Sequence, residues 1–585
     1  MACPSGWREV PDPEIDGLAT CDPFPESGPA DCAADEAHFP GEPGCARVGP
    51  ACPAGDFADD LPAGASVIYV RAGAAAGGDG TLASPFARIG DALAQASDGD
   101  VVAVGKGTYD EAPTVRDAVT LWGACAAETI VARSIWDGTF GSLNLAAPRG
   151  ATAKNLTVSG ERYGISVTGA SSAPVVLEAI VVRGTRWEGL WADAGASVVA
   201  RDLVVRDVRS ALDANDGHGV RVQSGASVTI ERGAIERARE IALFVQEGSS
   251  LSATDVVARG TQPEEADQLL GLGVGVLADA SAELVRVALV ENRTSGISVR
   301  EGGTLRAEDL FVARTAGQAL DGEYGYGVHA IEGVSVDLTR ATLAENRSLG
   351  LIFGGADASA TLTDVVIRDT EAREAGNLGG AGIQVSAAGV LELHRVALVR
   401  NRMAALLVAD ARALGEDVLI AGTRSTANAG IQGFAVQVTL GGSLDVARLE
   451  ARESRGAGIS VLEASDALLS DVAVVGTLPN ECAEDGLCPG YGWGAGISIA
   501  YGAHLDARRF VVSDAALCGV QLAENGTADL SAGEVSANPI GVNVTTDGFD
   551  LARLQEGVAY RDNVVNLDSL SLPIPEAAGI VEGGP

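Results

Sequence analysis

Short alternations of apolar and polar residues recur along most of the chain, and most of them open with a glycine. Typical copies of this Gly-apolar-x-apolar pattern are residues 164–167, 296–299, 382–385 and 496–499. Alternation with a period of two is typical of a β-strand that buries one face. The copies begin at residues 118, 141, 164, 189, 219, 242, 273, 296, 327, 350, 382, 405, 435, 458, 496, 519 and 541.

The spacing of these copies predicts a repeat architecture. From residue 219 to residue 519, intervals of 23 residues alternate with intervals of 30 to 38 residues. Each unit carries three apolar alternations, as at Ile297/Val299, Leu305/Ala307 and Leu310/Val312. Such a unit is too short for a strand, a helix and two loops, so we predict one coil of a parallel β-helix with three strands per coil. About seventeen stacked coils would form a rod on the order of 80 Å long.

Residues 69–109 carry a further series of short motifs. In order, they include Gly78-Asp79-Gly80-Thr81, Ser84-Pro85-Phe86, Gly99-Asp100-Val101-Val102 and Gly107-Thr108-Tyr109. This segment resembles the opening of pectin lyase-like right-handed parallel β-helix proteins, where it also occurs as a domain of unknown function in many secreted bacterial proteins. The resemblance implies an all-β, right-handed parallel β-helix with a short capping helix at about residues 86–96. It implies no particular activity, because one fold hosts many functions.

The chain divides into four predicted parts. Residues 1–64 form an extension rich in Cys, Pro and Gly, 65–117 form the N-terminal cap and first coil, 118–560 form the β-helix, and 561–585 form a C-terminal cap and tail. Every second coil carries an insertion at the same corner, so we expect a row of loops along one edge of the rod. The six insertions are 207–218, 260–272, 314–326, 369–381, 422–434 and 476–495.

Composition argues against two classes of function. The net charge of −38 leaves no basic stripe for nucleic-acid binding. No apolar run is long enough to suggest a membrane-spanning helix. The 75 glycines and an aromatic content of only 4% suit thin coils with small interiors.

The nine cysteines indicate disulfides formed in an oxidising compartment. We expect Cys482 and Cys488 to close the longest loop on itself, with Cys518 as a rival partner for either, and Cys125 to be a buried free thiol. A zinc site is the weaker alternative, because the N-terminal segment lacks CxxC spacing. If Cys3 is set aside, four N-terminal cysteines can form two bridges of open connectivity. The disulfide candidates are Cys21, Cys32, Cys45, Cys52, Cys482 and Cys488.

Cys3 also carries a hypothesis about the membrane. The sequence begins Met1-Ala2-Cys3 without a charged segment followed by an apolar one, so it predicts no signal peptide as it stands. If a lipoprotein cleavage site precedes Cys3, this cysteine is the acylated residue. A lipid anchor is then the only predicted link to a membrane. We expect an extracellular or outer-cell-surface protein.

Enzymes of the resembled fold usually carry catalytic acids, calcium ligands or basic groups on outward positions of the first strand. In the repeat, these are the x positions, which run from Ser166 to Asn543 and include no Asp or Glu. Glycoside hydrolysis ordinarily needs two carboxylates, and a calcium-assisted lyase needs clustered carboxylates and a base. Arg221 and His329 are the only suitable x residues, and they lie four coils, or about 19 Å, apart. The sequence therefore predicts no catalytic residue.

The x positions and the insertions also supply apolar and aromatic side chains. Trp191, Phe244, Ile352 and Leu407 predict an apolar stripe that neighbouring loops could shield from water. Alternatively, the stripe and the loops form a groove for an extended glycan, with aromatic rings as stacking platforms and loop carboxylates as its rim. The candidate ligand-binding residues are Trp191, Phe244, Tyr324, Tyr326, His329, Tyr491 and Trp493.

Acidic loop residues leave calcium as an open alternative, although no cofactor and no metal ligand are predicted. Asp216, Glu264 and Glu323 belong to no recognised calcium loop. The segment Gly77-Gly78-Asp79-Gly80 occurs once, whereas a calcium β-roll repeats its nonapeptide.

Together these patterns predict a non-enzymatic secreted or cell-surface scaffold, an acidic monomeric rod whose loops serve adhesion or contact an extracellular glycan or protein. The alternative is a polysaccharide-binding or polysaccharide-degrading β-helix whose site lies between the loop row and the first sheet. The missing carboxylates at the x positions favour the scaffold.

Overall fold

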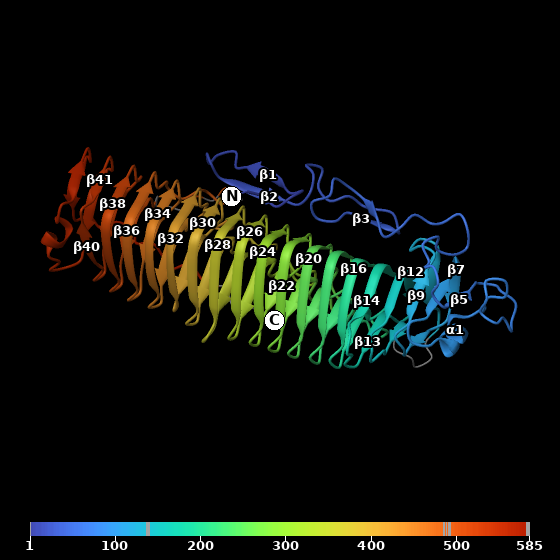
Figure 1. Ribbon diagram of the computed structural model, residues 1–585. Coiled ribbons are helices and arrows are strands. Elements are labelled where there is room, and N and C mark those ends of the chain that lie inside the picture. The colour runs from blue at the N-terminus through green and yellow to red at the C-terminus, as the bar shows by residue number, and fades with distance from the viewer. Residues whose placement is uncertain (1, 136–140, 484–485, 487, 489–492, 581–585) are drawn as a thin grey trace.

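The computed structural model describes residues 2–135, 141–483, 486, 488 and 493–580. Over these residues the chain forms an elongated rod of stacked coils (Figure 1). Two long sheets run along the rod, one of 18 strands and one of 22, and their strands pair in parallel. This confirms the predicted all-β parallel β-helix, the fold implied by the resemblance to pectin lyase-like proteins. Within the described part, no helix has the length and apolar character needed to span a bilayer.

The first sheet contains nearly all of the Gly-apolar-x-apolar segments. Its strands are β8 (Thr114–Val115), β11 (Gly141–Leu145), β13 (Tyr163–Thr168), β15 (Glu188–Asp193), β17 (His218–Val222), β19 (Ile241–Val245), β21 (Leu272–Val276), β23 (Ser295–Val299), β25 (Tyr326–Ile331), β27 (Leu349–Gly354), β29 (Ala381–Ser386), β31 (Ala404–Ala409), β33 (Phe434–Thr439), β35 (Ala457–Val461), β37 (Ala495–Ile499), β39 (Cys518–Leu522), β42 (Ile540–Val544) and β44 (Val565–Asp568). The predicted copy at residue 118 is wrong, because it falls on β9 (Thr120–Gly123) of the second sheet.

The second sheet changes the prediction of three strands per coil. Two predicted strands join into one long strand, as in β24 (Thr304–Ala313), so a coil contains two strands. Asp309 bends this strand with a φ of 56°, and pairing with β22 (Ser281–Val290) continues on both sides of the bend. The chain thus turns a corner without leaving the sheet. Other long strands include β14 (Val175–Arg183), β16 (Ser197–Arg206), β18 (Ser227–Glu236), β20 (Ser250–Arg259), β26 (Ser335–Ala344), β28 (Ser359–Arg368), β30 (Val390–Val399), β32 (Arg412–Ala421), β34 (Ser443–Arg452), β36 (Asp466–Val475) and β38 (His504–Ser513).

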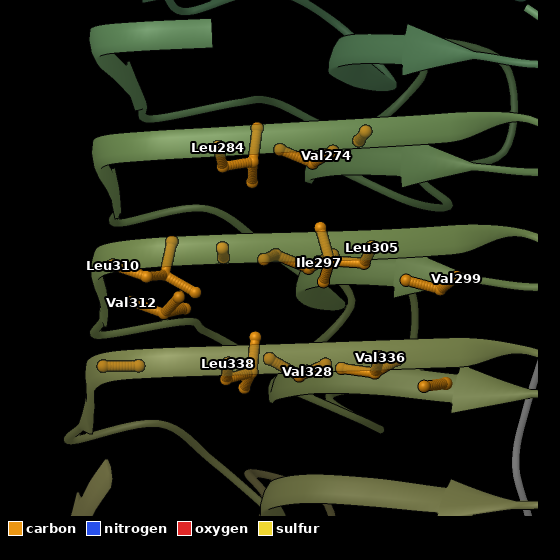
Figure 2. Close-up of a cluster of buried hydrophobic side chains, with 14 of the residues drawn as sticks. Val274, Leu284, Ile297, Val299, Leu305, Leu310, Val312, Val328, Val336 and Leu338 are labelled. Carbon is orange, nitrogen blue, oxygen red and sulfur yellow. The ribbon is translucent and has the colours of Figure 1, made fainter. Parts of the chain in front are cut away.

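Inward side chains of both sheets meet in one continuous core. Val299, Leu305 and Leu310 of one coil are at most 1% exposed, and Figure 2 shows this coil between two neighbours that bury Leu284 and Leu338. The glycine that opens each repeat is explained by close packing. A Cβ on Gly296 would lie 2.3 Å from Cγ1 of Val312 and 2.7 Å from the carbonyl oxygen of Gly327. The long strand therefore leaves no room for a side chain there.

One short helix, α1 (Ile89–Gln95), lies between β5 (Val67–Val70) and β6 (Val101–Val104) near one end of the rod (Figure 1). Ile89 and Ala92 are fully buried against the core. The Glu111 carboxylate accepts hydrogen bonds from the amides of Ile89, at 2.7 Å, and Gly90, at 3.0 Å. These amides belong to the first turn and have no partner within the helix.

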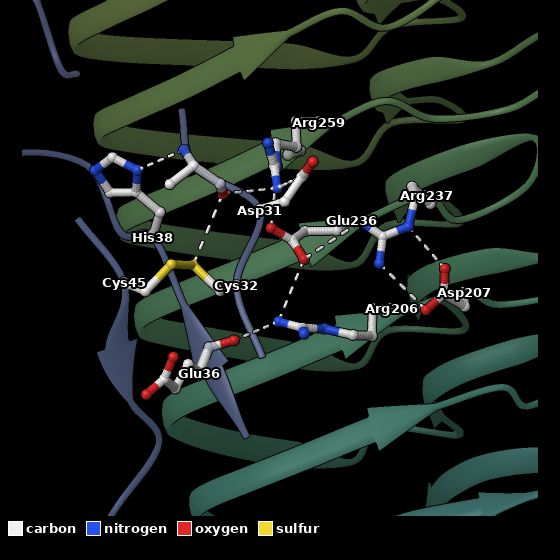
Figure 3. Close-up of polar contacts among 12 residues, drawn as sticks. Asp31, Cys32, Glu36, His38, Cys45, Arg206, Asp207, Glu236, Arg237 and Arg259 are labelled. Carbon is white, nitrogen blue, oxygen red and sulfur yellow. Dashed lines mark hydrogen bonds and ion pairs between the residues drawn. A yellow bond between two sulfur atoms is a disulfide. The ribbon is translucent and has the colours of Figure 1, made fainter. Parts of the chain in front are cut away.

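Residues 2–64 form an N-terminal strap along the outside of the second sheet (Figure 1). Phe24 and Phe39 are buried in one cluster with Val204 and Val257 of that sheet. Arg206 and Arg259 donate hydrogen bonds to strap carbonyl groups (Figure 3). Three disulfides staple the strap, and they join Cys3 to Cys21, Cys32 to Cys45, and Cys52 to Cys125.

These disulfides correct three predictions. Two bridges were expected within the set of Cys21, Cys32, Cys45 and Cys52, but only Cys32 and Cys45 pair with each other. Cys3, the proposed lipidation site, is bonded to Cys21, so its sulfur is not available for acylation. Cys125, expected to be a free thiol, pairs with Cys52 and ties the strap to the first coils. Cys482 and Cys488 are joined as predicted, and Cys518 is the one cysteine outside a disulfide in the described chain.

Candidate functional site

The insertions form a row of touching loops along one corner of the rod. Each connects a long strand of the second sheet to a strand of the first, as between β20 and β21. The amide of Ala266 donates to the carbonyl of Ala214 in the previous loop, at 3.0 Å. Further along, the amide of Ala375 donates to the carbonyl of Gly322, also at 3.0 Å. Neighbouring loops therefore contact one another along the side of the first sheet where its strands begin.

In the C-terminal half, this packing covers the apolar stripe. Ile352 and Leu407 are 2% and 0% exposed. They share a buried cluster with Tyr326, Phe434 and Ala578, and Ala578 comes from the C-terminal residues. This burial supports shielding from water as the role of the stripe in this half.

The predicted ligand-binding residues are divided by the same packing. Phe244, Tyr326 and His329 are 8%, 2% and 2% exposed, so little of these three rings lies at the surface. Burial and the nearby Arg300 lower the pKa of His329 to about 4, so this side chain is neutral at pH 7. The half-buried residues are Trp191, Tyr324 and Trp493, while Tyr491 lies outside the described residues.

Charged side chains gather at the loop corner in the N-terminal half. Three stand at or just before the starts of successive first-sheet strands, one occupies an x position, and two come from loops. We call this group the corner cluster, and it consists of Glu188, His218, Glu240, Arg221, Asp216 and Glu264.

His218 lies at the centre of the corner cluster and is 1% exposed. Its Nδ1 lies 3.1 Å from both carboxylate oxygens of Glu188, and its Nε2 lies 3.2 Å from an oxygen of Glu240. Burial lowers the pKa of His218, but the two glutamates outweigh burial and raise it to about 10. The imidazole is therefore held as a cation between two carboxylates. Arg221 adds a second cation and donates to Glu188 at 3.1 Å.

Glu264 lies near several other acidic side chains. Burial, followed by the charges of Glu240, Asp267 and Asp216, raises the pKa of Glu264 to about 7. A carboxyl group with this pKa can donate a hydrogen bond as well as accept one near neutral pH. It is also suited to proton transfer.

Replacing Glu264 with Gln should remove a pH dependence of stability. Because the folded-state pKa is raised from 4.5 to about 7, this group stabilises the fold fully below pH 4.5, and the contribution is lost as pH rises through 7. The thermal unfolding midpoint of the unsubstituted protein should therefore fall over this range more than that of Glu264→Gln. Glu265→Gln, at the exposed neighbouring position, serves as the control. Equal pH profiles for all three proteins would contradict the assignment.

Three aromatic side chains, here called the aromatic trio, lie beside the corner cluster. The ring centroid of Tyr163 lies 5.6 Å from that of Trp187 and 5.4 Å from that of Trp191, with edge-to-face geometry. All three side chains are half-buried. Burial raises the pKa of Tyr163 to about 12, and the charges of Glu188 and Asp216 contribute, so the phenol is close to the corner cluster.

Three residues of the corner cluster could hold a metal ion by distance alone. One ligand atom from each of Asp216, His218 and Glu240 lies within 4.8 Å of the others. A metal would first have to displace the proton that the glutamates hold on His218. Calcium also prefers oxygen ligands to a ring nitrogen. We therefore base no proposal on a metal.

Glu188 and His218 were not predicted, because neither residue occupies an x position and neither is an acidic residue of an insertion. Both residues stand one position before the repeat glycine. In the other copies that form first-sheet strands from Tyr163 onward, this position holds an uncharged residue, such as Ile241 or Ala381. Charged residues at this position in two successive copies could therefore have predicted a cluster of charges at this corner.

A cavity of about 490 Å³ lies further along the loop row. Tyr324, Tyr326 and Met403 line it together with Ile580 from the C-terminal residues. Arg373 and Glu323 form an ion pair at this cavity. The candidate residues Tyr324 and Tyr326 thus line a cavity whose lining does not include Trp191.

No protein-family model matches the chain, and no curated protein matches it. Among solved structures, pectate lyase Pel9A is 14% identical over 56% of this chain and 76% of its own, with a TM-score of 0.27. The catalytic unit of a GH87 alpha-1,3-glucanase from Streptomyces thermodiastaticus is 14% identical over 86% of this chain and 70% of its own, with a TM-score of 0.25. The Dettilon tailspike protein is 11% identical over 85% and 68%, with a TM-score of 0.24. Function is therefore argued from this chain's own residues.

Proposed function

We propose that the protein binds an extended glycan across the aromatic trio and the corner cluster. The observation that carries this proposal is the position of three half-buried rings directly beside a cluster of carboxylates and cations. A sugar presents apolar C–H faces to aromatic rings and hydroxyl groups to charged side chains. The described C-terminal residues bond to side chains of β33, β39 and β42 and line a cavity with Tyr326 of β25, so this site lies outside the part that they cover.

An extracellular location supports a glycan partner. The described chain contains four disulfides, and disulfides persist in oxidising compartments. The Cys52–Cys125 bridge spans 73 residues of sequence and fixes the strap to the β-helix. A secreted or surface-exposed rod is therefore the setting that we infer for the site.

Glycan cleavage is the second candidate. Glu264, with a pKa of about 7, lies near Asp216 and Glu240, and a protonated acid beside a carboxylate is the combination that glycoside hydrolysis uses. These residues come from loops and a turn, so the absence of acids at the x positions does not argue against this site. Product analysis of any bound glycan separates binding from cleavage.

Replacing Trp191 with Ala should weaken glycan binding about tenfold, because an aromatic contact contributes on the order of 1.5 kcal/mol. A glycan array would identify the ligand, and calorimetry would compare the affinities of the variants. Trp122→Ala is the matched control, since Trp122 is a half-buried tryptophan of the second sheet, with Lys154 4.0 Å above its ring. Equal affinity of both variants, or no glycan bound by the full chain, would overturn the proposal.

A further inference from the structure

The C-terminal residues 569–580, here called the tail, lie across the outward face of the first sheet. Three buried amide side chains of that face donate hydrogen bonds to tail carbonyl groups. Asn543 Nδ2 donates to Leu570 at 3.0 Å, Gln521 Nε2 donates to Pro573 at 3.0 Å, and Gln437 Nε2 donates to Glu576 at 3.3 Å. Gln437 also accepts the amide of Ala578, at 2.6 Å. Side chains of the first sheet thus bind the tail through its backbone groups.

The spacing of these contacts is that of an extended peptide. The accepting carbonyl groups are three residues apart, and a polyproline II helix has three residues per turn. From residue 570 to residue 576 such a chain rises about 19 Å. The donors stand on strands β42, β39 and β33. The two steps between them are unequal, one coil and then three, but the whole span of four coils also corresponds to about 19 Å. The segment Leu572-Pro573-Ile574-Pro575 suits this conformation.

Apolar contacts alternate with the polar ones. Leu572 packs against a cluster that includes Cys518 and Ile540, and Ile574 packs against one that includes Leu462. Ala578 is 3% exposed within the cluster that contains Leu407. The face therefore offers both amide donors and apolar contacts along the length of the tail.

We propose that this face, from β31 to β42, is a binding groove for an extended peptide, and that the tail is its tethered ligand, which detaches and rebinds. The first-sheet strands pair with one another without the tail, and residues 569–580 contain no strand. Within the described residues, side-chain amides and apolar contacts hold the tail on the sheet. The ligand class is a proline-containing segment with aliphatic side chains at the positions of Leu572 and Ile574 and a single acidic residue at the position of Glu576. This proposal does not depend on the glycan site.

Cys518 provides a direct measure of tail opening in the full-length protein. Its thiol is fully buried within the cluster that Leu572 contacts, and it is the only cysteine without a disulfide in the described chain. The rate of maleimide labelling of Cys518 should rise about tenfold or more in the double variant Gln437→Ala/Gln521→Ala, because the hydrogen bonds to the tail are lost. Gln246→Ala is the control, since its amide bonds to Gln223 at the N-terminal half of the rod. A synthetic peptide of residues 569–580 should slow labelling of the double variant, and a scrambled peptide should not.

An unchanged labelling rate in the double variant, or no protection by the peptide, would overturn the proposal. If the double variant does not fold, hydrogen exchange of the unsubstituted protein decides. The Ala578 amide should then exchange at least tenfold faster than the amide of Val520 in β39, because the tail opens without unfolding the sheet. Equal protection of the two amides would make the tail an integral part of the fold.

Discussion

Val299→Asp is expected to lower the free energy of unfolding by about 4 kcal/mol or more. Val299 of β23 is fully buried in the continuous core, where the side chains of neighbouring coils surround it (Figure 2). Loss of the valine contacts costs roughly 1.5–3 kcal/mol. The new carboxyl group also has to lose its hydration in an apolar interior, where it is either an unpaired charge or a neutral acid. Urea unfolding followed by circular dichroism would measure the loss.

Ser281→Asp is the matched control for this substitution. Ser281 begins the long strand β22 and is exposed, so the same carboxyl group remains hydrated. Its stability should change by no more than about 0.5 kcal/mol. A similar loss in both variants would contradict the assignment of Val299 to the interior of the coils.

The core could be predicted from the sequence because it depends on local periodicity. Alternation sets which side chains point inward, and the repeat glycine marks where two strands come too close for a Cβ, as at Gly296. The bends of the long strands were not predicted. In the sequence, Asp309 lies between two apolar alternations that read as separate strands. In the structure, its positive φ bends the chain there, and both alternations belong to the single strand β24.

A row of ion pairs at these bends was also not predicted from the sequence. Successive bend residues alternate between Asp and Arg, and each Arg pairs with the Asp of the preceding coil. Most of these side chains are at least one-third exposed or close to it, so each pair adds only about 0–1 kcal/mol. The pairs are Arg232–Asp202, Arg286–Asp255, Arg340–Asp309, Arg395–Asp364, Arg448–Asp417 and Arg509–Asp471. These Asp and Arg residues recur at regular intervals in the sequence. That recurrence could have predicted the ion pairs, whereas the overall count of charged residues could not.

The site could be predicted only in part, because its exposure depends on segments far away in the sequence. Trp191 and Leu407 occupy equivalent x positions, yet Trp191 is half-buried and Leu407 is fully buried. The difference arises from loops and from the tail, whose Ala578 packs near Leu407. Periodicity assigns the direction of a side chain, but it does not say which distant segment covers it.

The N-terminal strap is a second such segment, and it is anchored by buried charges. Glu236 of β18 is 1% exposed and lies 3.2 Å from Arg206 and 3.0 Å from Arg259. Both guanidinium groups also donate to the strap, Arg206 to the carbonyl oxygen of Glu36 and Arg259 to the carboxylate of Asp31 (Figure 3). One carboxylate therefore neutralises two buried cations that hold the strap.

Glu236→Gln is accordingly expected to destabilise the protein by about 3–5 kcal/mol, because it removes the buried carboxylate that Arg206 and Arg259 share and leaves Arg259 only the exposed Asp31. Glu231→Gln provides a matched control on the same strand, where Glu231 pairs with Arg201 at 2.8 Å and both side chains are 49% exposed. That variant should lose no more than about 1 kcal/mol. Urea unfolding would compare the two, and hydrogen exchange of residues 30–36 should quicken only in Glu236→Gln. Equal losses of stability, or unchanged exchange in the strap, would show that Glu236 does not anchor it.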